Sequence, residues 1–142
     1  MNINKIAENI NTHAGVIIGN LEQENLEVYT FLQKEFTTTD VTENHLFQFL
    51  YRSFYRLDNA GLTPAFKTEY FRILQEERVN STHDIESILG RLYSFRNRKG
   101  QESFQFSFVT KLLNILDHSY PIYDSEVARV FGFSRPYQTG FK

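Results

Sequence analysis

The sequence lacks several residue types and patterns on which common enzyme chemistries depend. It contains no cysteine, which excludes disulfides, thiolate nucleophiles and thiolate metal sites and fits a reducing compartment. It has neither a glycine-rich phosphate-binding loop nor the Gly-x-Ser-x-Gly turn of serine hydrolases. Its histidines are not spaced to share one face of a helix, so we expect no metal site and no cofactor. These histidines are His13, His45, His83 and His118.

Long apolar runs are also missing. The run Val16-Ile17-Ile18 is far shorter than the ~20 apolar residues that a membrane-spanning helix needs. No long apolar stretch follows Lys5 near the start of the chain, so this segment does not have the pattern of a secretory signal. We therefore expect a soluble, cytoplasmic protein that makes no membrane contact.

What the sequence does contain is typical of one globular domain. Its 142 residues are enough to bury a single core, and 41% of them are apolar while 23% are charged. The 14 Phe and 8 Tyr predict a core packed largely from rings. Residues 139–142 resemble the start of another element, which suggests a fragment or a naturally short version of a longer domain.

Charge is distributed unevenly along the chain. Residues 1–88 contain 7 Lys and Arg against 13 Asp and Glu, whereas residues 89–142 contain 8 against 4. The net charge of residues 1–88 is therefore −6, and that of residues 89–142 is +4. Such an asymmetry either marks a surface for a polyanion or reflects chance variation between short segments.

Hydrophobic periodicity predicts an all-α fold, a single helical domain of about six to seven helices. The one alternating stretch, 104–108, continues directly into a helical pattern. The predicted helices cover 3–12, 21–36, 41–58, 64–78, a segment that ends near 95, 103–117 and a segment that begins at 125.

Capping patterns locate some of the helix ends. Asp40 and Glu43 have the spacing of a capping box. Thr63 and Pro64 are suited to the N-cap and first position of a helix, and Gly61 is suited to the left-handed position after one. The helix over 41–58 is expected to bury a stripe composed of Leu46, Phe49, Leu50, Phe54 and Leu57.

The candidate chemistry lies in residues 104–132, at Lys111 and Asp124. Lys111 falls at the border of the apolar arc of helix 103–117. Either its stem lies along apolar surface with the ammonium in water, or the ammonium lies in a partly dry cleft, where its pKa falls and it becomes a nucleophile. Asp124 precedes Ser125 and is expected to cap the last helix, with or without a chemical role.

The stretches FVTKLLNIL and PIYDSEVARVF resemble the helix-hairpin-helix DNA glycosylase superfamily, most closely its smaller 8-oxoguanine DNA glycosylase-like members. In that family a Thr-Lys or Ser-Lys pair lies on a helix, and after a turn a Pro-aliphatic-x-Asp segment opens the next helix. The resemblance covers residues 104–132. It implies that Lys111 is a Schiff-base nucleophile and that Asp124 is the carboxylate that assists opening of the sugar.

The resemblance further implies binding to double-stranded DNA and base excision by a glycosylase with lyase activity, with the base taken out of the stack. Better-known members carry a glycine-rich hairpin just before the lysine, where this chain has only Gly100 nearby, in a basic loop. The alternative is a non-catalytic all-α interaction module. The candidate contacts to DNA phosphates are Arg96, Arg98, Lys99, Arg129 and Arg135.

Overall fold

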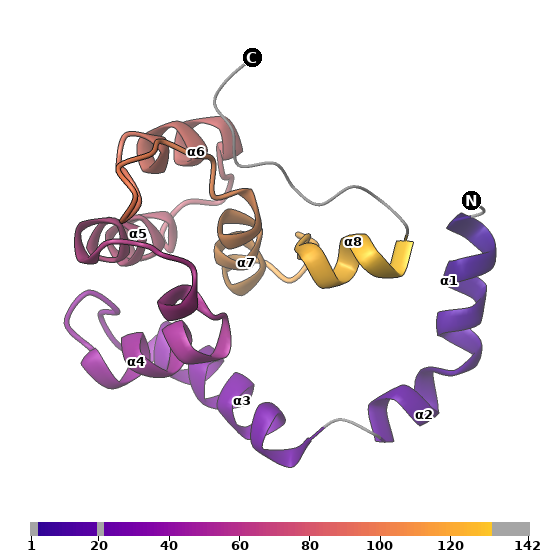
Figure 1. Cartoon of the computed structure of the whole chain (residues 1–142). Helices are drawn as coiled ribbons and strands as arrows, with labels where there is room; N and C mark the ends of the chain where they lie inside the picture. The colour runs from indigo at the N-terminus through magenta and orange to yellow at the C-terminus, as the bar shows by residue number, and fades with distance from the viewer. Residues whose placement is uncertain (1–2, 20–21, 132–142) are drawn as a thin grey trace.

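The computed structural model describes residues 3–19 and 22–131, and these form eight α-helices, one short 3-10 helix and no strand. The predicted all-α fold is confirmed for these residues, and Figure 1 shows the helices in order. The count exceeds the prediction because the short α2 has no clear sequence pattern. The elements are α1 (Ile3–Thr12), α2 (Ala14–Gly19), α3 (Gln23–Thr38), α4 (His45–Phe54), η1 (Leu57–Asn59), α5 (Pro64–Glu77), α6 (Ile85–Tyr93), α7 (Phe106–Leu116) and α8 (Ser125–Phe131).

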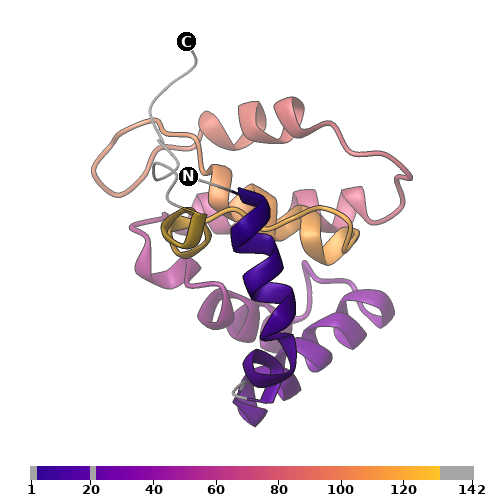
Figure 2. The same cartoon turned by 90° about the vertical axis from the view of Figure 1, so that its right-hand side faces the viewer.

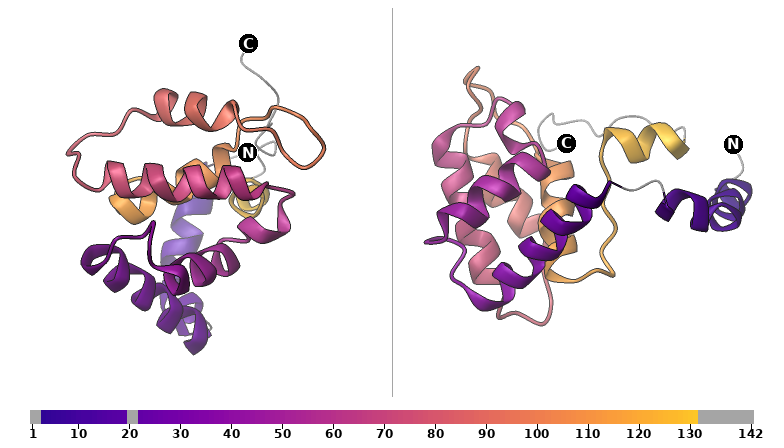
Figure 3. Two further views of the ribbon diagram at one scale, coloured as in Figure 1. Left: turned by 90° about the vertical axis from the view of Figure 1, so that its left-hand side faces the viewer. Right: turned by 90° about the horizontal axis from the view of Figure 1, so that it is seen from below.

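One aromatic core holds the middle of the chain together. Helix α3 packs against α4, α5 packs against α6, and α7 packs against both α5 and α6. Figure 3 shows these helices gathered into one body. Rings of α4 and α5 contact one another in this core, mostly in tilted or T-shaped arrangements, as the high Phe and Tyr content predicted. The largest fully buried rings are Phe47, Tyr51, Phe66, Tyr70 and Phe71.

Two tyrosine hydroxyls connect three helices inside this core. The Tyr70 hydroxyl donates to the backbone carbonyl of Phe108 at 2.7 Å, and the Tyr51 hydroxyl lies 2.7 Å from that of Tyr70. Because a tyrosine hydroxyl carries a single proton, Tyr51 must be the donor to Tyr70. The resulting chain of hydrogen bonds fixes α4 and α5 to the first turn of α7, the helix that carries Lys111.

The start of α4 differs from the prediction. The Asp40 carboxylate does not form a capping box but accepts from the backbone N–H and the hydroxyl of Thr42. Asn44 caps the helix instead, since its side chain accepts from the N–H of Phe47. The local Asp-x-Thr turn satisfies the carboxylate within two residues, so the helix begins at His45 and not near 41.

The prediction of which face of α4 is buried was also partly wrong. Leu46 and Phe49 were expected in the core but are 59% and 57% exposed, whereas Phe47 and Tyr51 are fully buried. The helix also ends at Phe54, and only the separate turn η1 brings the buried Leu57 back to the core. A sequence rich in apolar residues on both sides of a helix does not determine which side packs inward.

The elements that follow agree more closely with the prediction. Thr63 caps α5 by accepting from the N–H of Phe66 at 3.2 Å, with Pro64 in the first position. Gly61 has a φ of 67°, in the left-handed region as predicted, although it follows η1 and not α4. Helix α7 begins at Phe106, three residues later than expected.

The first helix contributes little to the core. No residue of α1 is buried, and Figure 1 shows α1 and α2 to one side of the main body. The apolar residues of α1 therefore add little to the stability of the fold. Within the described residues, no helix combines the length and apolar character needed to cross a membrane.

Candidate functional site around Lys111

Lys111 occupies the predicted border position on α7, and its side chain is largely covered. Only 13% of that side chain is exposed. Its Nζ lies 5.0 Å from the centre of the Phe108 ring and donates to the backbone carbonyl of Tyr55 at 3.4 Å. The amino group is therefore in a partly dry environment, which corresponds to the second interpretation of this lysine and not to simple extension into water.

This environment changes the protonation of Lys111. Burial lowers the pKa of Lys111, because loss of hydration disfavours the charged ammonium. The carboxylate of Asp124 acts in the opposite direction, and the guanidinium of Arg56 adds to the lowering. Since desolvation is the largest of these effects, more of Lys111 is neutral at a given pH than of a lysine in water. The neutral amine is the nucleophilic form.

Asp124 caps α8 as predicted and also faces Lys111. Its Oδ1 accepts from the backbone N–H of Val127 at 3.0 Å, and its backbone carbonyl accepts from Ala128 at 2.9 Å. Its Oδ2 lies 3.9 Å from Nζ of Lys111, and the Asp124 side chain is 25% exposed. The structure thus brings the two predicted site residues together at a place that solvent reaches. Their chemical roles stay a prediction.

Thr110 holds the backbone that leads into Asp124. Its hydroxyl oxygen accepts from the N–H of Tyr123 at 3.1 Å and donates to the carbonyl of Ser107 at 2.7 Å. The side chain is nearly buried, so these bonds compete little with water. Because Tyr123 directly precedes Asp124, Thr110 sets how far the carboxylate lies from Lys111. The Thr-Lys pattern in the sequence draws attention to this threonine, but it does not predict the contact with Tyr123.

Arg56 reaches the site from the end of α4 and was missed by sequence reasoning. It follows Tyr55, whose carbonyl accepts from Lys111. Its φ of 63° makes it the one non-glycine residue of the described chain in the left-handed region. The sequence offers no signal for it, because the left-handed position becomes apparent only once α4 is known to end at Phe54.

The basic loop, residues 96–100, is a compact turn. The Oδ1 of Asn97 accepts from the backbone N–H groups of Lys99 and Gln101, both at 3.0 Å. Gly100 closes the turn with a φ of 75°, a conformation that glycine adopts at little cost. The loop predicted from its polar and glycine residues is therefore present, and it is held by its own backbone contacts.

Arg98 attaches the basic loop to the connection before α5. Its backbone N–H donates to the carbonyl of Gly61 at 2.9 Å, and its Nε donates to the carbonyl of Leu62 at 3.3 Å. The same connection, residues 55–62, begins beside Lys111. Figure 2 and the left panel of Figure 3 agree that this connection and the basic loop lie toward one edge of the molecule. Lys111 and the basic loop therefore both contact the connection 55–62.

The other predicted phosphate contacts are less closely tied to the site. Arg96 is 67% exposed in its side chain and lies 3.8 Å from the carboxylate of Glu102. Arg129 is exposed on α8, the helix that Asp124 caps. Arg135 lies outside the described residues. Of the five arginine and lysine candidates, the structure thus relates Arg98 most directly to the connection beside Lys111.

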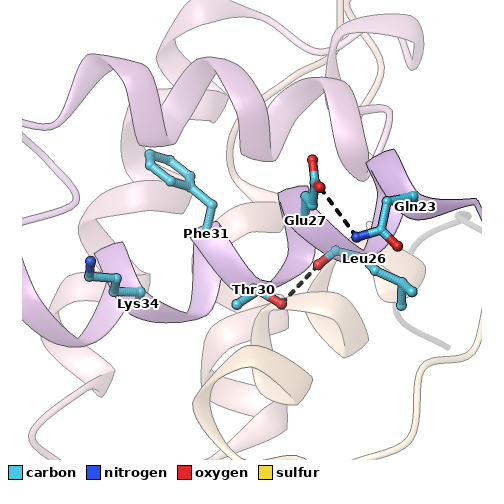
Figure 4. A pocket seen from close by; sticks show the side chains of 6 residues that line it. All are labelled: Gln23, Leu26, Glu27, Thr30, Phe31 and Lys34. Carbon is cyan, nitrogen blue, oxygen red and sulfur yellow. Dashed lines mark hydrogen bonds between the residues drawn. The ribbon is translucent and has the colours of Figure 1, made fainter.

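Two surface hollows among the described residues lie elsewhere. One, of about 350 Å³, runs along the outer face of α3, as Figure 4 shows. The other, of about 270 Å³, lies between α4 and α5 around Asp58. Neither Lys111 nor Asp124 lines them. The residues that line the first hollow are Gln23, Leu26, Glu27, Thr30, Phe31 and Lys34.

The chemistry of the site is that of an amine beside a carboxylate. Among the residues that the structure describes, no group of three or more His, Cys, Asp or Glu is placed to hold a metal ion. The pair can instead form a carbon–nitrogen bond at Lys111 and stabilise a neighbouring positive charge through Asp124. Comparisons of the chain with protein-family models, with curated proteins and with solved structures find no match.

Proposed function

We propose that this chain is a base-excision protein that acts on double-stranded DNA, a glycosylase with lyase activity in which Lys111 is the nucleophile. The observation that carries the proposal is the position of the Lys111 Nζ, on a side chain 13% exposed and 3.9 Å from the carboxylate of Asp124. A lysine whose pKa burial lowers, next to a carboxylate fixed by a helix cap, is suited to forming a Schiff base.

The reaction uses both residues. The neutral Nζ of Lys111 adds to C1′ of the sugar as the bond from C1′ to the base nitrogen breaks, and the base leaves with the electron pair of that bond. One Nζ proton passes to the departing base. The C1′–O4′ bond then breaks, O4′ takes up the remaining Nζ proton, and Nζ and C1′ are left joined as the Schiff base. The Asp124 carboxylate stabilises the positive charge that develops at C1′. At an abasic site, where C1′ is an aldehyde, the same amine forms the Schiff base with loss of water.

The order of the elements along the chain supports this proposal and the relation to the helix-hairpin-helix glycosylases. Thr110 and Lys111 lie on α7, and the connection through Pro121 leads to Asp124 at the start of α8. Gly100, with its left-handed backbone, lies in the connection before α7, where better-known family members carry their glycine-rich hairpin. The basic loop around it offers backbone and cationic groups of the kind that bind phosphates.

Borohydride trapping on a duplex with one abasic site tests the proposal, and this substrate requires no knowledge of the damaged base. Reduction of a Schiff base leaves the protein covalently linked to the DNA. We expect the parent chain to cross-link and Lys111→Gln to lose the cross-link. Lys34→Gln, which removes one positive charge from the exposed outer face of α3, is the matched control and should cross-link normally.

A folded parent chain that forms no cross-link at any pH would contradict the proposed chemistry. A duplex with 8-oxoguanine, used in the same assay, then asks whether the chain also removes a base. Cross-linking to the abasic duplex alone would assign lyase activity without base excision.

The second candidate is a non-catalytic all-α interaction module, and one observation favours it. Leu46 and Phe49 lie three residues apart on α4, and each is more than half exposed. An apolar surface that such residues help to form is what a contact with another protein would cover. Retained folding, absence of cross-linking for parent and Lys111→Gln alike, and no affinity for duplex DNA would together favour this module.

A further inference from the structure

Arg56 occupies a backbone position where a glycine would be expected. It is the first residue after the C-cap of α4, and its φ of 63° and ψ of 31° are left-handed. Glycine adopts this conformation freely, whereas a side chain with a Cβ atom makes it less favourable. The arginine therefore adopts a backbone conformation that its Cβ atom disfavours.

Both neighbours of Arg56 in the chain are buried in the core. Tyr55 on one side is 5% exposed and Leu57 on the other is fully buried. Both side chains are anchored in the core, so the backbone between them must turn within one residue. The same turn directs the Arg56 side chain outward, where it is exposed.

The charge of Arg56 has no counterpart in the described part of the chain. Among the described residues, no carboxylate or carbonyl forms a hydrogen bond or ion pair with its guanidinium. The Arg56 guanidinium instead acts on another cation, because it lowers the pKa of Lys111. An unpaired arginine held beside a lysine makes the site attractive to an anion that binds from outside.

We propose that Arg56 binds a backbone phosphate of the DNA strand whose sugar reaches Lys111. The inference rests on the proposed function, since it takes DNA as the ligand. The planar guanidinium presents two parallel N–H groups to the two free oxygens of a phosphodiester. Arg56 thereby positions the strand, while Lys111 and Asp124 act on the sugar.

The path of the chain extends this contact toward the basic loop. The connection 55–62 starts at the carbonyl that Lys111 contacts and ends at the two carbonyls that bind Arg98. Arg56 lies near its first residue and the basic loop is tied to its last two. A DNA strand that follows this connection would meet Arg56 at the site and then the basic loop.

Affinity for a duplex that contains a tetrahydrofuran abasic analogue tests the inference, because this analogue lacks the C1′ aldehyde and does not cross-link. Binding is measured by fluorescence anisotropy over a range of salt concentrations. We expect Arg56→Gly to weaken binding by about tenfold and to reduce the slope of log affinity against log salt by about one. Arg56→Lys should keep most of the slope, since it keeps the charge.

Two controls separate binding from folding and from net charge. Arg56→Gly should melt at or above the temperature of the parent, because glycine relaxes the left-handed backbone. Lys34→Gln removes the same charge from α3, and it should leave both the affinity and the salt slope unchanged. Lys34 is next to Glu35, whose carboxylate accepts from Asn44 at the start of α4. Arg56 follows the other end of that helix, so the control removes a charge away from the proposed contact.

Several outcomes would overturn the inference. Equal affinity and slope for parent and Arg56→Gly, or an equal loss for Lys34→Gln, would show that Arg56 is not a phosphate contact. If the parent still cross-links to abasic DNA in that case, the proposed function stands and only the role of Arg56 fails. Arg56-dependent binding without any cross-link would instead support the phosphate contact and contradict the lyase. A parent that neither binds nor cross-links would contradict both.

Discussion

Replacing Tyr70 with phenylalanine removes a hydroxyl that holds two partners in the core. The Tyr70 hydroxyl donates to the carbonyl of Phe108 at 2.7 Å and accepts from Tyr51. Both tyrosines are 0% exposed, so water does not replace the lost contacts. The variant loses the bond to Phe108 and leaves the buried Tyr51 hydroxyl without an acceptor. Together these two effects should lower the free energy of unfolding by about 2–3 kcal/mol.

The corresponding change at Tyr51 should cost less. Tyr51→Phe removes only the first donor in the chain, and Tyr70 keeps its bond to Phe108, so we expect a loss of about 1 kcal/mol. In the double variant both hydroxyls of this pair are gone, so neither is left without its partner. Its cost should therefore fall below the sum of the single costs by about 1 kcal/mol, a coupling that a double-mutant cycle measures.

Urea unfolding followed by circular dichroism provides the free energies, a suitable probe for a helical chain without tryptophan. Tyr55→Phe is the matched control, because the buried Tyr55 hydroxyl has no partner among the described residues. Its removal should be neutral or stabilising. A coupling energy within ~0.3 kcal/mol of zero, or a larger loss for Tyr51→Phe than for Tyr70→Phe, would refute the assigned direction of the hydrogen bonds.

Three further predictions concern α7 and the site. Phe108→Ala and Leu112→Ala should each destabilise by about 2–5 kcal/mol, as large-to-small core changes do, and unchanged thermal melts would contradict the buried face of α7. Asp124→Asn should cost at most about 1 kcal/mol in unfolding experiments, because asparagine also caps helices, yet it should slow cross-linking. Burial places the folded-state pKa of Lys111 below its unfolded value of 10.5, so the unfolded chain binds more protons between these values. As pH rises toward 10.5, the parent should therefore gain stability relative to Lys111→Met, and cross-linking should accelerate through the lowered pKa.

Local patterns in the sequence determined the helical fold and several helix ends. Apolar residues at helical spacing predicted α1 and α5 closely, because periodicity and capping depend on residues only a few positions apart. The Thr63-Pro64 start of α5 and the left-handed Gly61 are of this kind. Asp124 as a helix cap also followed from its place before Ser125, without knowledge of the fold.

Contacts between distant residues were decided only by the tertiary structure. The exposure of Phe49 and the burial of Tyr51 depend on which side of α4 meets α3 and α5, and both sides of that helix are apolar. In the same way, the pattern of α7 alone placed Lys111 at the border of the apolar arc. It did not decide whether the ammonium lies in water or in a partly dry environment. The carbonyl of Tyr55 and the carboxylate of Asp124 come from other segments, and their approach covers the amine.

The site therefore combines the two kinds of information. The sequence pointed to Lys111 and Asp124 as candidates, since the pattern of a Thr-Lys helix followed by an Asp-capped helix is local, and the structure brings the two side chains within 3.9 Å of each other. The sequence did not identify Arg56, because a charge beside Lys111 is created by the left-handed turn at the end of α4, 55 residues earlier in the chain. Residue order determines helices and caps, because these depend on short-range hydrogen bonds and periodicity. The burial, pKa and electrostatic surroundings of a side chain arise from packing between segments that the sequence alone does not bring together.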